Sequence, residues 1–264
     1  MIFVALGLGG LAALLAFFAK KQGGKAYAMQ LTETVNAAEL ARQADEIAKE
    51  IGAGSFTKAA ELKGEVECAS PLTAEMSGAP CVWYRSVVTR DYEESYTERD
   101  ADGKTRTGTR RGSEQVSANE RRAAFYVRDE SGATLVEPEG ASMDGERVLS
   151  RYEQNFSGPS IQVGAFRLNL GPLGGGRRTL GFKLEEWALP VGARVYVLGE
   201  ARDDEGRLRV AKPGAKGLPF IISRRSEEEL VKAAKGGSLA LTIAAAVVAL
   251  GAVAVAVLSL LGVI

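Results

Sequence analysis

The stretch IFVALGLGGLAALLAFFA (residues 2–19) contains no charged side chain, and neither does SLALTIAAAVVALGAVAVAVLSLLGVI (residues 238–264). All 33 Lys and Arg and all 33 Asp and Glu fall between Lys20 and Lys235. An apolar run of about 18 or more residues is long enough to cross the hydrocarbon core of a bilayer as a helix. The sequence therefore predicts transmembrane helices at residues 1–20 and 238–264, with a soluble region between them.

The first apolar run has a second interpretation, as a cleaved signal peptide. Signal peptides carry a positive charge ahead of the apolar core. Here the chain begins Met1-Ile2-Phe3, and the first basic residues, Lys20 and Lys21, follow the core. The pattern favours an uncleaved anchor, and therefore a two-pass protein that meets the lipid bilayer through two spans.

The basic residues that flank the two spans all lie on the side of the soluble region. They are Lys20, Lys21, Lys25, Arg224, Arg225, Lys232 and Lys235. The positive-inside rule places such residues in the cytoplasm, although long loops obey it weakly. We therefore expect the soluble region to be cytoplasmic.

Small residues predict that the two spans pack on each other, because they let helix backbones approach closely in lipid. The expected stripes are Gly9, Gly10, Ala13 and Ala16 in the first span, and Ala245, Ala249 and Ala252 in the second. Neither span contains an ionisable residue, which argues against a proton relay or ion pathway.

The composition excludes several classes of chemistry. There is no histidine, and the only cysteines are Cys68 and Cys81. Histidine-based triads and dyads are thus excluded, and so are most zinc sites. The formal net charge of +0 argues against a nucleic-acid partner. The carboxylates show no spaced pair of the kind that acid–base catalysis needs. We therefore expect no metal, no cofactor and no catalytic residue.

Capping signals predict helices next to both spans. After a flexible exit at Lys21–Gly24, Asn36 and Glu39 fit the start of an amphipathic helix that ends near Gly52, within a linker region of residues 21–59. Ser226 and Glu229 fit a capping box at the start of a juxtamembrane helix, residues 224–237. Gly236 and Gly237 would permit a bend before the second span.

Between these helices, residues 60–223 have the pattern of a β-rich domain. Residues 81–88 (CVWYRSVV) are rich in aromatic and β-branched side chains. Two hairpins are expected, with turns at residues 129–132 and 203–206. We predict an α+β fold: a small antiparallel OB-like barrel or sandwich with flanking helices, between two transmembrane helices.

Three stretches have a functional and a structural interpretation. The basic run of residues 104–111 could contact anionic headgroups, but acidic neighbours favour a solvated hairpin tip. The glycine-rich run of residues 171–178 lacks the Gly-Lys-Ser/Thr ending of a phosphate-binding loop. Trp83, Tyr84 and Trp187 could line a groove, but packing is the favoured role.

The block Pro80-Cys81-Val82-Trp83-Tyr84-Arg85 resembles the GIDE family of membrane-bound ubiquitin ligases, whose domain is also described as "beside a membrane". Further blocks follow in the family's order as far as Gly217–Ser223. The residues that carry the resemblance, expected to be structural, are Pro80, Cys81, Trp83, Tyr84, Arg85, Asp129, Gly132, Pro138, Gly192, Gly199, Pro219 and Phe220.

The resemblance implies ubiquitin transfer, but in this family that activity needs a RING with eight Cys/His zinc ligands. With two cysteines and no histidine, this chain has no residues that match them. We therefore expect a non-catalytic, membrane-anchored interaction or sensor module with a protein partner. The alternatives are a recognition subunit whose RING belongs to another chain, or a lipid-headgroup-binding domain. In the family's mitochondrial members the domain faces the intermembrane space, which is the opposite of the charge-based prediction.

Overall fold

The structure, a computed structural model, describes residues 2–99, 103–154, 160–170, 177–204, 206–214 and 217–261. The chain divides into two compact units. The first contains Met1–Lys63, Tyr196–Ile221 and Arg225–Ile264, and the second contains Gly64–Val195 and Ile222–Arg224. Two strands, β1 (Thr57–Glu67) and β12 (Arg194–Arg202), continue from one unit into the other.

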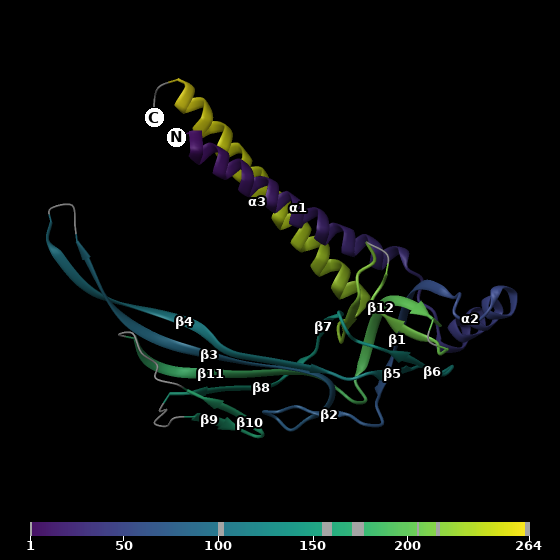
Figure 1. Ribbon diagram of the computed structural model, residues 1–264. Helices are drawn as coiled ribbons and strands as arrows, with labels where there is room; N and C mark the ends of the chain where they lie inside the picture. Colours follow the sequence, from purple (N-terminus) through teal and green to yellow (C-terminus); the bar gives the residue numbers. More distant parts are fainter. Residues whose placement is uncertain are drawn as a thin grey trace. The chain divides into compact units, whose positions relative to one another are not determined.

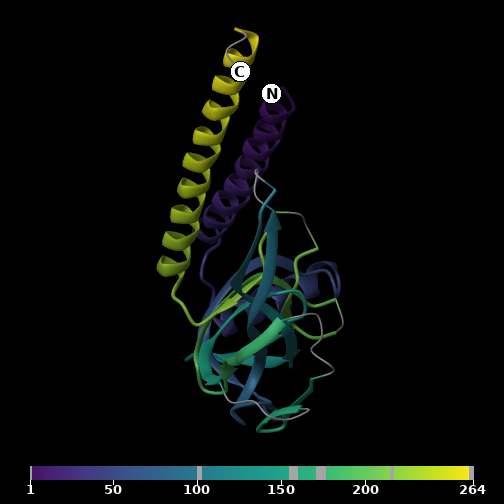
Figure 2. The same ribbon diagram turned by 90° about the vertical axis from the view of Figure 1, so that its left-hand side faces the viewer.

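The first unit is built around two long helices, α1 (Ile2–Leu31) and α3 (Glu227–Leu260). They run side by side in Figure 1, and they remain so in the view turned by 90° (Figure 2). Within them, Phe3–Leu31 and Glu227–Ser259 are long and apolar enough to cross a membrane. The unit also contains α2 (Ala37–Ile51), β13 (Arg209–Ala211) and most of β12.

Alanines at seven-residue intervals are buried in both long helices: Ala12, Ala19 and Ala26 in α1, and Ala245 and Ala252 in α3. This heptad spacing is that of helices that pack as a left-handed coiled coil. The hydroxyl of Ser238 in α3 donates a hydrogen bond to the carbonyl oxygen of Ala19 at 2.9 Å, which fastens the pair.

The small-residue stripe predicted for α1 was wrong, and that for α3 was right at Ala245 and Ala252 only. The exposed residues are Gly9, Gly10, Ala13, Ala16 and Ala249. The first helix has small residues on more than one face, and their spacing alone does not select the face that meets α3.

Both long helices continue through glycines where the sequence predicted an exit or a bend. Helix α1 extends past Gly23 and Gly24 to Leu31, and α3 passes through Gly236 and Gly237. Glycine weakens an isolated helix by only about 1 kcal/mol, which tertiary packing can offset. At Gly23 an added Cβ would lie 3.2 Å from the Ser238 hydroxyl, so the glycine permits close approach of the two helices.

The predicted helix starts are confirmed. The side chain of Asn36 accepts a hydrogen bond from the Glu39 amide, and α2 ends at Gly52, whose φ is 101°. At α3, Ser226 and Glu229 form a complete capping box. These short-range signals are readable because capping satisfies backbone amides that a helix leaves unpaired at its start.

The second unit is a set of antiparallel strands, most of which are labelled in Figure 1. Its main sheet has the order β2-β3-β11-β8, and β4 also pairs with β3. The bounds are β2 Leu72–Thr73, β3 Pro80–Arg99, β4 Thr105–Arg122, β5 Phe125–Arg128, β6 Ala133–Val136, β7 Ser142–Asp144, β8 Glu146–Glu153, β9 Ser160–Val163, β10 Phe166–Asn169 and β11 Arg177–Pro190, with β14 (Ile221–Ser223) at the unit boundary.

A hydrophobic core forms where the β9–β10 hairpin packs on this sheet. The hairpin contributes Ile161 and Phe166, and the sheet contributes Val88, Phe182 and Leu184. All five side chains expose 7% or less of their surface. This core stabilises the part of the sheet from which the longest strands extend.

The predicted fold class is confirmed. Strand β1 pairs with β5 on one side and with β12 on the other, so the sheet that contains it closes into a small barrel. The pairings of β1 with β5, β5 with β6, and β12 with β13 are antiparallel. Both predicted hairpins are present, as β5–β6 and β12–β13, although Glu205 in the second turn lies outside the described residues.

Gly145 is a close-contact position in the second unit that the sequence did not indicate. A Cβ added there would lie 2.2 Å from the carbonyl oxygen of Ala188 and 2.9 Å from the Trp83 ring. Real Cβ atoms do not come this close to backbone oxygens, so any side chain must displace β11 or the indole.

We expect Gly145→Ala to reduce the free energy of unfolding by about 2 kcal/mol, because the added methyl overpacks a rigid site. The measurement is thermal unfolding of the purified full chain. Gly214→Ala is the control, since its Cβ would have Glu200 Oε1 at 3.8 Å as its nearest neighbour. Equal unfolding temperatures for the two variants would contradict the prediction.

Candidate functional site

The bulky family-motif residues of β3 lie in the core. Cys81, Trp83 and Tyr84 expose 0%, 4% and 3% of their surface. The Trp83 indole donates a hydrogen bond to Glu120 Oε1 at 2.9 Å. Burial, together with the nearby charge of Glu186, raises the pKa of the Cys81 thiol to about 11. This thiol is protonated at neutral pH and is therefore a poor nucleophile.

The motif residues outside β3 serve turns and close contacts. Asp129 Oδ1 accepts hydrogen bonds from the amides of Ser131 at 2.7 Å and Gly132 at 3.0 Å, which shapes the β5–β6 turn. A Cβ at Gly199 would lie 2.9 Å from the Phe220 ring. Gly192 has a φ of 78°, which only glycine adopts readily.

The remaining motif residues do not converge on a common cleft. Pro80 and Arg85 are exposed, Pro219 is half-buried, and Pro138 is buried with its carbonyl accepting from Arg122 at 2.8 Å. The sites considered next are made of other side chains.

A buried carboxylate holds the β2–β3 loop of the second unit. Glu186 in β11 is 0% exposed and accepts three hydrogen bonds: from the amides of Met76 at 2.9 Å and Ser77 at 2.8 Å, and from the Ser86 hydroxyl at 2.8 Å. An ionised carboxylate is buried at this depth only when such donors replace its water. The arrangement positions a loop, and nothing in its geometry presents a reactive group.

A second buried carboxylate fastens the first unit at the foot of its helices. Glu61 in β1 is also 0% exposed. Its two oxygens accept from the Thr34 hydroxyl at 2.5 Å and the Tyr196 hydroxyl at 2.9 Å. Lys63 lies 2.9 Å from Glu61 and 2.9 Å from Glu227, the first residue of α3. We call these five residues the Glu61 network.

The electrostatics of the Glu61 network favour the protonated forms of its donors. Burial and the Glu61 charge raise the pKa of Tyr196, so its hydroxyl stays a donor at neutral pH. Burial lowers the pKa of Lys63, but hydrogen bonds to Glu61 and Glu227 outweigh this effect and raise it. The network therefore connects α3 to β1 and β12 through charge-assisted hydrogen bonds.

Strands β3 and β4 form a long antiparallel ribbon, which is visible at the left of Figure 1 and which we call the arm. Its base is organised by Arg90, which exposes 3% of its surface. Arg90 donates to Thr179 Oγ1 at 2.9 Å and to Glu114 Oε1 at 3.0 Å. The guanidinium of Arg177 lies 4.4 Å from the centre of the Tyr92 ring, a cation–π contact.

Two rows of charge cross the arm from β4 through β3 to β11. One row is Arg110, Glu94 and Arg177, and the other is Arg111, Glu93 and Arg178. The strand register places the members of each row directly opposite one another. Hydrogen bonds from the flanking arginines, those of Arg177 and Arg178 first, lower the pKa of both Glu94 and Glu93.

Each row contains two guanidinium groups for one carboxylate, and three of the four arginines face solvent, whereas Arg177 also pairs with Glu114. The side chains of Arg110, Arg111 and Arg178 are 69%, 76% and 72% exposed. The basic run of residues 104–111 was predicted as a hairpin tip; Lys104 precedes strand β4, and residues 105–111 are its first part. Of the glycine-rich run, residues 171–176 lie outside the described residues, and Arg177 and Arg178 begin β11.

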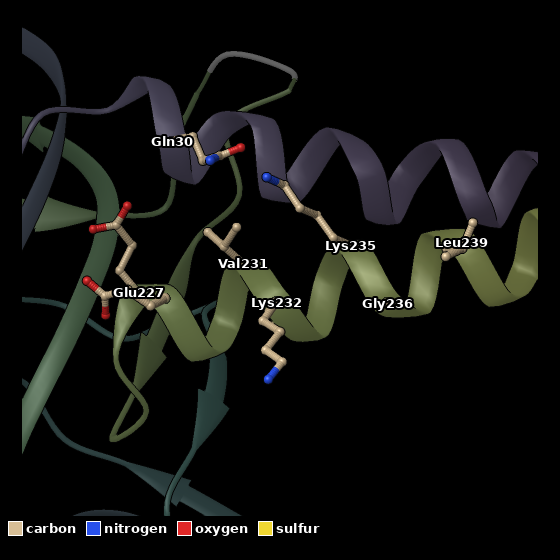
Figure 3. Close-up of a pocket in the computed structure, with 8 residues that line it drawn as sticks. Gln30, Glu227, Val231, Lys232, Lys235, Gly236 and Leu239 are labelled. Carbon is tan, nitrogen blue, oxygen red and sulfur yellow. The ribbon is translucent and has the colours of Figure 1, made fainter.

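A cleft of about 580 Å³ lies at the foot of the two long helices. It is lined by Gln30 of α1 and by seven residues of α3: Glu227, Glu228, Val231, Lys232, Lys235, Gly236 and Leu239. In Figure 3, Val231 and Lys235 extend toward α1, whereas Lys232 points away from it. The cleft is open to solvent and combines both signs of charge with apolar surface.

No group of three or more Cys, Asp or Glu side chains with the spacing of a metal site occurs among the residues that the structure describes. Both cysteines are free thiols, Cys81 buried and Cys68 half-buried.

The GIDE family model, described as E3 ubiquitin ligase, matches residues 93–258, which is more than half of the chain. The chain therefore belongs to the GIDE family. The matched range begins in β3 and ends in α3, so it includes the motif residues from Asp129 to Phe220 but not the block of residues 80–85. No curated protein and no solved structure matches the chain.

Proposed function

We propose that this chain is a membrane-anchored, non-catalytic interaction module in which the arm contacts a protein partner. The observation that carries the proposal is the pair of Arg–Glu–Arg rows, which present exposed guanidinium groups on an extended ribbon. Guanidinium groups bind carboxylates bidentately, so a partner with acidic side chains fits this surface.

The length of the arm supports the same proposal. Within the part of the chain that the structure describes, the pairing of β3 with β11 reaches Glu94, whereas its pairing with β4 continues to Arg99 opposite Thr105. Two-stranded ribbons are only marginally stable in water without a third strand or a packing surface. A bound protein would supply that surface to residues 95–99 and 105–109.

The test is a charge reversal on the arm, Arg110→Glu with Arg111→Glu, in full-length protein crosslinked in its native membranes. We expect the recovery of specific partners, measured by quantitative mass spectrometry, to fall about tenfold, since charge-assisted contacts contribute about 1.5–3 kcal/mol each. Arg147→Glu in β8 is the matched control, because Arg147 is 55% exposed and pairs with a strand glutamate in the same way. Unchanged recovery from the arm variant would overturn the proposal.

Family membership gives the same experiment a second result. If the partners lost with the arm variant include a RING protein or a ubiquitin-like protein, the chain is the recognition part of a ligase-like assembly. If they are other membrane proteins, it is an anchored scaffold or sensor. The alternative that the arm binds lipid headgroups predicts instead that the variant loses liposome binding and keeps its partners.

We also propose that the soluble region faces the cytoplasm, supported by the seven basic residues that flank the two apolar runs on its side. The test is labelling of half-buried Cys68 with a membrane-impermeant maleimide in sealed, right-side-out vesicles. We expect no labelling until the vesicles are opened. Labelling of sealed vesicles would place the region on the other side.

A further inference from the structure

In the cleft at the foot of α1 and α3, the chemical character of the lining side chains changes along the helix axis. Glu227 and Glu228 lie at one end, Lys232 and Lys235 in the middle, and Gly236 and Leu239 at the other end. At 1.5 Å per residue, the carboxylates and Leu239 are about 17 Å apart along α3. Leu239 lies in the apolar stretch that begins at Gly236, so this end of the cleft is the one directed into the membrane.

We propose that this cleft binds a single phosphatidylethanolamine molecule. The polarity of the cleft matches that lipid group by group: the primary ammonium faces the carboxylates, the phosphate faces the lysines, and an acyl chain lies along Val231 and Leu239. The formal charge of the ionisable lining residues is zero, which fits a zwitterionic headgroup better than an anionic one. The volume of about 580 Å³ is within the range of small-molecule sites.

The two lysines of the cleft differ from Lys63 in having no carboxylate partner. Within the described residues, neither Lys232 nor Lys235 forms an ion pair, although Glu228 precedes Lys232 by four residues. Lys63, by contrast, bridges Glu61 and Glu227. The ammonium groups at positions 232 and 235 are thus available to a phosphate.

The geometry assigns separate roles to the two lysines. Lys235 extends toward α1 and toward Gln30, whose side-chain amide is a further hydrogen-bond donor (Figure 3). These two side chains bind the phosphate within the cleft. Lys232 extends in the other direction and attracts the phosphate electrostatically from the rim.

The carboxylates provide the selectivity. A primary ammonium donates three hydrogen bonds, whereas the quaternary ammonium of phosphatidylcholine donates none. Phosphatidylglycerol brings a net negative charge and no ammonium, so it leaves Glu228 without a cation, whereas Glu227 keeps its ion pair with Lys63. We therefore expect the order of retention to be phosphatidylethanolamine, then phosphatidylcholine and phosphatidylglycerol.

The test is native mass spectrometry of the full chain in mild detergent with equal amounts of the three dioleoyl lipids. We expect one retained phosphatidylethanolamine molecule, reduced about tenfold by Lys232→Gln with Lys235→Gln, since charge-assisted hydrogen bonds to phosphate are lost. Glu228→Gln should abolish the preference for phosphatidylethanolamine over phosphatidylcholine.

The control is Lys20→Gln with Lys21→Gln, which removes the same charge from exposed positions of α1 that do not line the cleft. Retention by the control equal to that of the wild type supports a site rather than general attraction to headgroups. Equal retention of all three lipids, a preference for phosphatidylglycerol, or equal losses in the cleft and control variants would each overturn the proposal.

Discussion

Replacing Glu186 by leucine is expected to reduce the free energy of unfolding of the second unit by about 3–5 kcal/mol. The leucine has a similar volume but removes the acceptor of three hydrogen bonds. It leaves the Met76 and Ser77 amides and the buried Ser86 hydroxyl without their partner. Each unsatisfied buried donor costs about 1–3 kcal/mol.

The measurement is equilibrium unfolding in urea followed by tryptophan fluorescence, because both tryptophans, Trp83 and Trp187, belong to the second unit. Glu185→Gln is the control at the adjacent position of β11, where the carboxylate pairs with Arg147 and Lys183 instead. We expect the control to change stability by less than about 1 kcal/mol, as for other partly exposed ion pairs. A Glu186→Leu variant as stable as the control would show that the β2–β3 loop does not depend on this carboxylate.

The second large effect is expected at Glu61. Glu61→Leu should weaken the Glu61 network by about 3 kcal/mol, because it leaves the Tyr196 hydroxyl and the Lys63 ammonium without their shared acceptor. The loss is smaller than for a fully buried ion pair because the Lys63 side chain is 44% exposed and water replaces part of its interaction. Tyr196→Phe removes one donor only and should cost about 1 kcal/mol.

The measurement is hydrogen exchange of the β12 amides, residues 196–202, by mass spectrometry of the intact protein in detergent. A loss of about 3 kcal/mol corresponds to exchange about a hundredfold faster through local opening. Glu65→Leu, on an exposed position of the same strand, is the control. If both β1 variants accelerate exchange equally, the Glu61 network does not specifically stabilise β12.

The elements of the fold that could be predicted from the sequence are those whose signal is local. Asn36 and Ser226 predict the starts of their helices because each caps a backbone amide only three residues further along the chain. The turn at Asp129 is read in the same way, from one side chain and the two amides beside it. The continuation of α1 through Gly23 could not be read, since it depends on Ser238, more than two hundred residues away.

The side chains of the candidate sites depend on register and burial, which no local pattern reveals. Glu61 and Glu186 look like ordinary strand carboxylates among the 33 acidic residues until their donors are placed. The Arg–Glu–Arg rows require three strands in register, with Arg177 brought beside Glu94 from 83 positions along the chain. Glu61 stands between Ala60 and Leu62, so strand alternation assigns it to the solvent face, and its burial could not be read from the sequence.

Strand β4 also affects whether copies of the chain associate with one another on a membrane. It is an 18-residue strand, and among the described residues β3 is its only pairing partner, so its outer edge offers free backbone donors and acceptors. Proteins tethered to a bilayer meet their copies repeatedly in similar orientations, which favours edge-to-edge polymerisation. The charged side chains along β4, among them Arg106, Arg110, Glu114 and Arg121, make such stacking costly. The charges on β4 therefore oppose self-association of the arm and leave it free to bind a different protein.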